Sequence, residues 1–280
     1  MRNNRFIIDA HCHIFPDKIA AKAAENIGAF YGIPVAAPAT VENMLALMER
    51  QGIDLAIVSS SALAPQQVMK ANEFLLNAAL QNPDRIVTLG TLHPGCTETE
   101  LAEHVRFLRQ NPFHGVKIHP DMLGISILDP AMEKIYAACE EAGLPLLLHT
   151  GDNRYDYSNP PMVEQVLRNH PGLTLIGGHF AGLHHYTEAA ETLSGYDNLY
   201  CDCSSSFVRL NEEEAKYCIR RFGTNRVMFG TDFPVCIPDF DLDYLFRLGY
   251  DEETLEKLLW RNAARIYHLD SETLIRAGLL

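Results

Sequence analysis

Residues 115–179 read GVKIHPDMLGISILDPAMEKIYAACEEAGLPLLLHTGDNRYDYSNPPMVEQVLRNHPGLTLIGGH, and in them one arrangement occurs three times. A short apolar run reaches a histidine near its end, and a longer amphipathic segment separates it from the next run. The predicted elements, in order, are Gly115–His119, Pro130–Ala142, Pro145–Thr150, Met162–Asn169 and Thr174–His179. His119, His149 and His179 are 30 residues apart, about one strand–helix unit. Strict alternation of this kind favours a parallel sheet.

The same alternation extends to both ends of the chain. The further predicted strands are Phe6–His13, Asp54–Ser60, Arg85–His93, Leu199–Ser204 and Arg226–Asp232. The further helices are Val41–Gln51, Gln66–Gln81, Glu98–Gln110, Tyr186–Leu193 and Glu212–Phe222, with more after the last strand. Eight strand–helix units predict an α/β fold closed into a (β/α)8 TIM barrel, which typically needs about 250 residues. An open Rossmann-like sheet is the alternative, but no GxGxxG follows the first strand. We expect one domain over residues 1–280.

Charge and composition exclude several classes of protein. The 36 acidic and 23 basic residues give a net charge of −13, which disfavours nucleic acid as a partner. The N-terminal apolar run is interrupted by Asp9, His11 and His13, so we predict neither a signal peptide nor a membrane span. Seven cysteines without a CxxC pair are interpreted as reduced thiols, which predicts a cytoplasmic protein.

Metal-capable side chains stand at the ends of the predicted strands. His11 and His13 end the first strand, His93 the third and Asp232 the eighth. All C-terminal strand ends of a parallel barrel lie on one face, so these groups and the three evenly spaced histidines should converge on one mouth. Residues two apart in a strand point to the same side, so His11 and His13 address one point while Cys12 packs behind. A single histidine at a strand end is more often structural, but a cluster of imidazoles is costly unless it is paired or metal-bound.

Six stretches of the sequence resemble the amidohydrolase superfamily. They are DAHCHIFP (9–16), GVKIHP (115–120), LLLHTG (146–151), IGGHF (176–180), GTDFP (230–234) and RNAARIYHL (261–269). The chain is most similar to the amidohydrolase-2 branch, which includes aminocarboxymuconate-semialdehyde decarboxylase-like enzymes and uncharacterised metal-dependent hydrolases.

The resemblance implies a metal site. Its ligands would be His11, His13, His149 and Asp232, holding one divalent metal, expected to be zinc, with a position left for water. Asp232 would also take a proton from that water, and His179 would act as acid–base partner or oxyanion stabiliser.

A second metal remains an alternative. Lys117 is either a carbamylated bridge between two metals, an ammonium that binds substrate or is buried in an ion pair, or a side chain without a direct role. His119 would bind a second metal or the substrate. We favour a mononuclear site with Lys117 and His119 facing the substrate, and His93 is a further candidate for the substrate pocket.

Two loops and an insertion are candidates for specificity. Arg154 and Tyr155 follow the fifth strand and Arg209 follows the seventh, and an arginine on this face suggests an anionic substrate, with a surface salt bridge as the alternative. Residues 16–40 form a long insertion that is either a lid or a surface decoration.

Two enzymatic functions fit these features. The first is hydrolysis of an amide, ester or lactone of a small molecule, with or without a carboxylate, and the alternative is non-oxidative decarboxylation of a small carboxylated substrate. We expect hydrolysis, because decarboxylases of this branch often have a longer chain. A barrel kept only as a binding scaffold would predict a broken ligand set, and all four ligand positions are intact. Pairing of barrels through outer helices into a homodimer is common but is not readable from the sequence.

Overall fold

Eight parallel strands form the centre of the molecule in a computed structural model that describes residues 4–235 and 239–279. They are β1 (Ile8–His13), β2 (Leu55–Ser59), β3 (Ile86–Thr91), β4 (Phe113–Ile118), β5 (Leu146–Leu148), β6 (Leu175–Gly177), β7 (Leu199–Asp202) and β8 (Val227–Met228). Each strand pairs with the next in sequence order. The segment after β8 hydrogen-bonds back to β1, since Ala10 N donates to Phe229 O at 2.9 Å and His13 N to Phe233 O at 2.7 Å. The predicted (β/α)8 barrel is confirmed.

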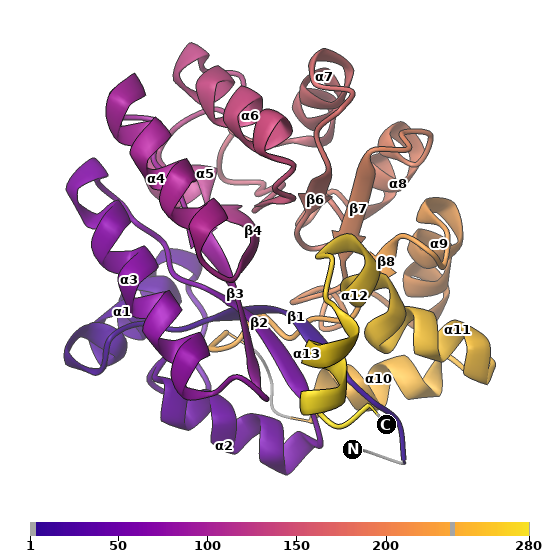
Figure 1. Ribbon diagram of the computed structural model, residues 1–280. Coiled ribbons are helices and arrows are strands. Elements are labelled where there is room, and N and C mark those ends of the chain that lie inside the picture. Colours follow the sequence, from indigo (N-terminus) through magenta and orange to yellow (C-terminus); the bar gives the residue numbers. More distant parts are fainter. Residues whose placement is uncertain (1–3, 236–238, 280) are drawn as a thin grey trace.

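Helices surround this sheet (Figure 1). Those that follow the strands are α2 (Val41–Gln51), α3 (Val68–Gln81), α4 (Glu98–Gln110), α6 (Pro130–Ala142), α7 (Pro160–Asn169), α8 (Tyr186–Leu193), α9 (Glu212–Phe222) and α10 (Phe240–Arg247). Shorter ones are α5 (Pro120–Leu123), α11 (Glu252–Glu256), α12 (Asn262–Ile266) and α13 (Ser271–Arg276). Several helices begin at a residue whose side chain caps the first turn. At the start of α4, Thr97 and Glu100 form a capping box.

Apolar side chains fill the part of the barrel interior that lies away from the C-terminal ends of the strands. Ile8, Leu55, Ile176 and Met228 belong to one buried cluster, and α12 packs against the same cluster. Toward the C-terminal ends of the strands the interior becomes polar, and Lys117 on β4 is only 1% exposed there. Branched apolar residues are the usual filling of such an interior, so a buried lysine at this level marks a functional region.

A bulge in β1 sets the direction of its histidines. Asp9 pairs with Ala56 but Cys12 with Val58, so β1 has one extra residue between these pairs. Bulges of this kind re-aim side chains. Cys12 joins the apolar layer outside the sheet, as predicted, while the rings of His11 and His13 meet edge to face with centroids 5.0 Å apart.

The strands end earlier than the sequence pattern predicts. β6 stops at Gly177 and β8 at Met228, so His179 and Asp232 lie in the loops that follow. Both have left-handed backbones, with φ of 60° and 66°. Such a conformation is uncommon for a residue with a Cβ and is incompatible with a strand. The side chains still reach the barrel mouth, but from turns rather than from strand ends.

The insertion after β1 contains a well-formed helix, α1 (Asp17–Tyr31). It ends at Gly32, whose φ of 67° suits a residue without a Cβ. In the described ranges, no helix is long and apolar enough to cross a membrane. Six of the seven cysteines are described, and all six are buried thiols; Cys236 lies outside the described residues.

Candidate metal centre

His11 is held from behind by a carboxylate of β7. Its Nδ1 lies 2.9 Å from Asp202 Oδ2 and 3.0 Å from Ser204 Oγ. Burial, and next the charge of Lys117, lower the pKa of His11 to about 4. The imidazole is therefore neutral, Nδ1–H donates to Asp202, and the lone pair on Nε2 faces the barrel mouth.

Asp202 remains ionised in this arrangement. Burial opposes its ionisation, but His11 and the hydroxyl of Ser204, which donates at 2.5 Å, hold the pKa of Asp202 well below its ordinary range. The backbone N–H groups of His179 and Ser204 also donate to this carboxylate, each at 3.1 Å. One charged group at the end of β7 thus fixes a residue of β1 and residues of the loops that follow β6 and β7.

His13 and Asp232 complete this side of the mouth. His13 Nε2 lies 3.3 Å and His11 Nε2 3.6 Å from Asp232 Oδ1. Burial lowers the pKa of His13, so its imidazole is neutral as well. Burial opposes ionisation of Asp232, but the bond to His13 and the nearby imidazoles keep its pKa far below the ordinary value. Two imidazole nitrogens therefore approach one oxygen of a charged carboxylate.

His119, His149 and His179 form a hydrogen-bonded chain with Tyr31 of α1. His119 Nδ1 accepts from Met122 N at 3.3 Å, so the proton of neutral His119 is on Nε2, 2.6 Å from the hydroxyl oxygen of Tyr31. That hydroxyl then points to His149 Nε2 at 3.3 Å. His149 Nδ1 lies 3.0 Å from His179 Nε2. Burial holds the pKa values of His119 and His149 well below the ordinary value, in keeping with neutral rings.

The ring nitrogens of His149 are thus engaged by Tyr31 and His179. Ligand atoms of His11, His179 and Asp232 lie within 4.8 Å of one another, and so do those of His119, Asp121 and His149. The structure thus offers two groups able to hold a divalent metal. It brings His11, His13 and Asp232 together, whereas His149 is engaged by Tyr31.

Two further ionisable side chains lie beside these histidines. Lys117 Nζ is 3.0 Å from His11 Nε2, and burial lowers the pKa of Lys117 to about 8. Asp121 Oδ2 lies 3.6 Å from His149 Nε2, while its Oδ1 is buried without a hydrogen-bond partner in the part of the chain described. Burial and the charge of Asp152 raise the pKa of Asp121 to about 7.

Arg154 fastens α1 over the centre. Its guanidinium donates to Asp152 at 2.9 Å and to the carbonyl oxygen of Phe30. It also lies 4.6 Å from the ring centroid of Phe30 and 5.0 Å from that of Tyr31. Tyr155 stacks on Phe30 with centroids 5.8 Å apart. We call α1 the lid helix because it packs over the centre, and the fifth-strand loop clasps its end.

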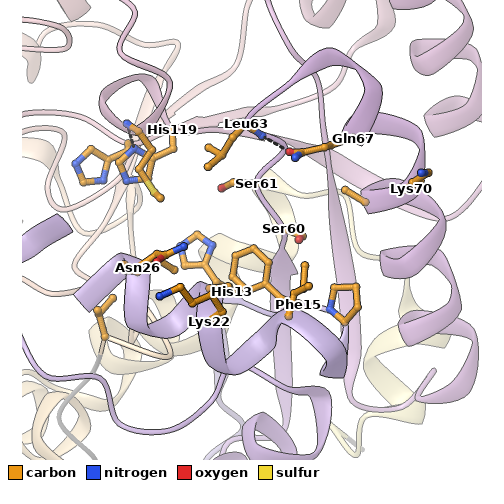
Figure 2. Close-up of a pocket in the computed structure, with 18 of the residues that line it drawn as sticks. His13, Phe15, Lys22, Asn26, Ser60, Ser61, Leu63, Gln67, Lys70 and His119 are labelled. Atoms are coloured by element: carbon orange, nitrogen blue, oxygen red, sulfur yellow. Dashed lines mark hydrogen bonds between the residues drawn. The ribbon is translucent and has the colours of Figure 1, made fainter. Parts of the chain in front are cut away.

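A cavity of about 810 Å³ opens above the centre (Figure 2). His13, His119, His149 and Asp232 contribute to its wall, together with residues of α1 and of the β2–α3 segment. His93, Arg154, Tyr155 and Arg209 are not among its lining residues. His93 Nδ1 accepts from Gly95 N at 2.9 Å, and Arg209 donates to Ser205 O at 2.9 Å. Their predicted contacts with substrate would need another arrangement of these loops.

Sequence reasoning missed four polar residues of the centre: Tyr31, Asp121, Asp202 and Ser204. A signal for Asp202 is present, because Cys201 and Cys203 alternate on one face of a strand and thereby place Asp202 on the other. Tyr31 lies in the insertion over residues 16–40, and nothing in its sequence context indicates a contact with the histidines.

The family model described as Amidohydrolase matches residues 8–269. A 2-amino-3-carboxymuconate-6-semialdehyde decarboxylase of Dictyostelium discoideum is 23% identical over 273 residues, covering 80% of this chain and 75% of the relative. An uncharacterised TIM-barrel protein of Bordetella bronchiseptica superposes with a TM-score of 0.77 at 21% identity, over 98% of this chain and 100% of the other. A 5-carboxyvanillate decarboxylase of Novosphingobium aromaticivorans, solved with manganese and a nitrobenzoic acid, has a TM-score of 0.75 at 18% identity, over 96% and 97%.

These comparisons contradict the expectation of hydrolysis. The two relatives above whose names state a reaction are both decarboxylases. Chain length was a poor guide, because it reports the size of loops and insertions and not the groups at the centre of the barrel.

Proposed function

Since the chain belongs to the amidohydrolase family, we propose that it is a metal-dependent, non-oxidative decarboxylase of a small carboxylated substrate. The observation that carries the proposal is the convergence of His11 Nε2 and His13 Nε2 on Asp232 Oδ1, within 3.6 and 3.3 Å, beside a large cavity. The decarboxylase relatives support the choice of reaction.

The residues present fit a divalent cation. Metal ligands must be deprotonated, and here the imidazoles of His11 and His13 are neutral and Asp232 is charged. We assign His11, His13 and Asp232 as ligands, with His149 joining them once its Nε2 leaves Tyr31. Three imidazoles and a carboxylate suit zinc, and manganese is the metal of the carboxyvanillate decarboxylase.

A bound divalent cation would supply Lewis acidity to the anionic oxygens of the substrate. In the reaction, the bond between the carboxylate carbon and the substrate carbon that bears it breaks. CO₂ leaves, and the electron pair that remains on the substrate carbon takes a proton. We assign delivery of that proton to His179. Its Nδ1 is held 2.9 Å from Ser204 O, so Nε2, which lies 3.0 Å from His149 Nδ1 in this structure, is the nitrogen left to carry the proton.

The rest of the site prepares the substrate. We propose that Lys117 and His119 face the substrate's polar groups, with Lys117 as an ammonium. Closure of α1 excludes water, which favours conversion of a charged carboxylate to neutral CO₂. One metal, with no carbamate on Lys117, is the arrangement that we favour.

The test combines metal content with product analysis. The protein is purified without added metal, and bound metals are measured by elemental analysis, beside Asp232→Asn and the exposed control Asp197→Asn. We expect about one metal per chain, lost in Asp232→Asn only, and release of CO₂ from a panel that includes 5-carboxyvanillate and 2,6-dihydroxybenzoate. Failure to bind zinc, manganese or cobalt would overturn the proposal, and two metals per chain would bring Lys117 and His119 into the ligand set.

Location and assembly also belong to the proposal. The six buried thiols support a cytosolic location. A homodimer through the outer helices remains a prediction that light scattering tests directly.

A further inference from the structure

The cavity extends well beyond the metal centre. Its volume of about 810 Å³ lies toward the upper end of the roughly 300–1,000 Å³ common for ligand pockets, so a one-ring carboxylate would leave much of it unfilled. The outer walls are formed by α1 on one side and by the β2–α3 segment on the other. A substrate that uses this space must reach outward between the two.

Large apolar side chains remain exposed along that route. Ile19 on α1 is 51% exposed and Leu63 before α3 is 48% exposed, and both line the cavity. Phe15 and Ile27 lie deeper in the same wall and are buried. When a ligand covers apolar groups that line a cavity, the apolar surface leaves water and the free energy of the complex falls.

The outer cavity is positively charged although the chain is not. Lys18, Lys22 and Lys70 line it, and Asp232 is the sole carboxylate among the described lining residues. Lys22 pairs with Glu25 at 2.9 Å. Lys18 and Lys70 are exposed and form no salt bridge with any residue that the structure describes. In a chain of net charge −13, this local excess of positive charge favours an anionic ligand group.

The charge lies away from the metal centre. Figure 2 shows His119 at one side of the pocket and Lys70, on α3, at the opposite side, with Ser60, Ser61 and Leu63 between them. A ligand held at the centre by one carboxylate therefore needs an extended body to bring a second charge to Lys70.

We propose that the cavity binds an elongated, mainly apolar molecule with two anionic groups, one at the metal centre and the second against Lys18 and Lys70. The first half of this statement rests on the proposed function. The outer subsite rests on the lysines and the apolar walls alone. Because Lys18 and Lys70 are solvent-exposed, each should contribute modestly and in a salt-dependent way.

Two probes that differ by one charge test the subsite. Binding of 4,4′-biphenyldicarboxylate and 4-biphenylcarboxylate is measured by calorimetry on the metal-loaded protein, and again after metal removal. We expect the dicarboxylate to bind roughly 3- to 10-fold more tightly than the monocarboxylate, a preference that falls with added salt.

Matched lysine variants locate the second charge. The double substitution Lys18→Gln/Lys70→Gln should abolish the preference, and Lys216→Gln on α9, outside the cavity, should leave it unchanged. Equal binding of the two probes, no binding of either, or a preference that survives the double substitution would each overturn the inference.

The outcomes also separate this inference from the proposed function. If the protein binds no metal and releases no CO₂ but still prefers the dicarboxylate through its lysines, the subsite stands and the decarboxylase proposal falls. If CO₂ is released and no preference exists, the reverse holds.

Discussion

His11 Nδ1 lies 2.9 Å from Asp202 Oδ2, so a carboxylate on β7 orients an imidazole on β1. The two residues are separated by 191 positions in the sequence, and barrel closure brings them together. Partners of this kind fix the tautomer of a ligating histidine and raise its basicity. Asp202 is therefore a positioning residue, although it does not face the cavity.

Replacing Asp202 by Asn should weaken metal binding by about 10- to 100-fold, because the amide no longer holds His11 with its Nε2 lone pair toward the centre. Affinity is measured by competition with a chromophoric chelator, and circular dichroism verifies the fold. Ser204→Ala is the companion variant, since it removes a donor to Asp202 and keeps the charge; its effect should be smaller. Unchanged affinity in Asp202→Asn would contradict the assigned role.

Tyr31→Phe should have the opposite effect on metal affinity. The hydroxyl of Tyr31 occupies His149 Nε2, so His149 must break this bond before it can join His11, His13 and Asp232. A hydrogen bond contributes a net of about 0.5–1.5 kcal/mol, so its removal should tighten metal binding by roughly 2- to 10-fold.

The matched control for that experiment is Tyr155→Phe. Tyr155 stacks on Phe30 at the same clasp and makes no hydrogen bond to the histidines. Equal or weaker metal binding by Tyr31→Phe would show that His149 is not a ligand held back by the lid.

The fold was predictable because its signals are local. The helix at Glu98–Gln110 was predicted with its observed bounds, since amphipathic periodicity and the turn before it are both visible in sequence. The predicted ends of the strands were less accurate. Nothing in the pattern indicates that His179 and Asp232 adopt left-handed backbones. Their backbone N–H groups donate to residues distant in the sequence, Asp202 Oδ1 and His11 O.

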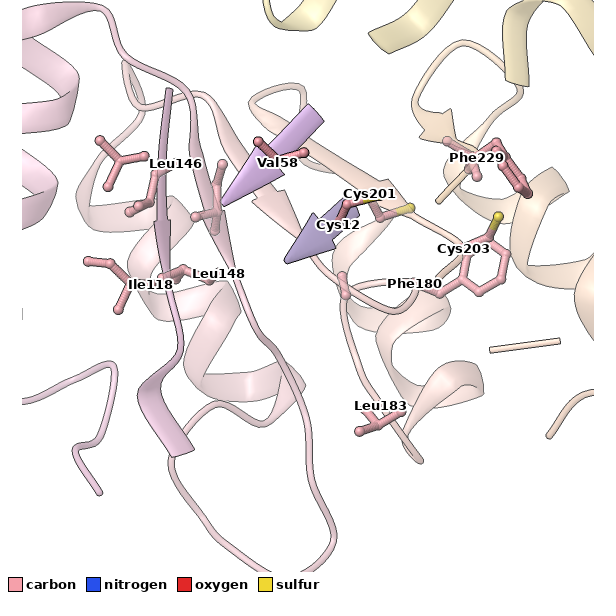
Figure 3. Close-up of a cluster of buried hydrophobic side chains, with 14 of the residues drawn as sticks. Cys12, Val58, Ile118, Leu146, Leu148, Phe180, Leu183, Cys201, Cys203 and Phe229 are labelled. Carbon is pink, nitrogen blue, oxygen red and sulfur yellow. The ribbon is translucent and has the colours of Figure 1, made fainter. Parts of the chain in front are cut away.

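The candidate site was predictable only in part. The histidines stand out by type and position, but Tyr31 meets His119 across 88 positions and no spacing rule indicates that contact. Figure 3 shows the alternation that would have located Asp202: Cys201 and Cys203 lie in the outer apolar layer with Phe180 and Phe229. The reaction could not be read from the ligands, because one ligand set serves both hydrolysis and decarboxylation.

His114, remote from the centre, should make stability fall at low pH. Burial lowers its pKa below the ordinary value of about 6.5, against the opposing effect of its bond to Tyr267 O. The unfolded chain therefore binds a proton more readily, and the free energy of unfolding falls as pH drops through about 6.5.

The test is the pH dependence of Tm in metal-free protein. His114→Gln retains a donor for Tyr267 O but cannot be protonated, so its Tm should fall less than that of the parent between pH 8 and pH 5. Parallel curves for the two proteins would show that His114 does not contribute.

Arg154→Lys should loosen the lid. The guanidinium holds Asp152 and covers the rings of Phe30 and Tyr31, and an ammonium cannot reproduce this planar fork. If the substitution lowers the free energy that holds the end of α1 closed by about 1–2 kcal/mol, local opening there becomes roughly 5- to 30-fold more frequent. Hydrogen exchange at the amides of residues 27–31 measures this directly. Arg209→Lys is the control, because Arg209 donates to Ser205 O and, among the residues that the structure describes, has no hydrogen bond or ring contact with α1. If exchange were unchanged in Arg154→Lys, the clasp would not be what keeps α1 closed, and the arginine would again be a candidate for binding an anionic substrate.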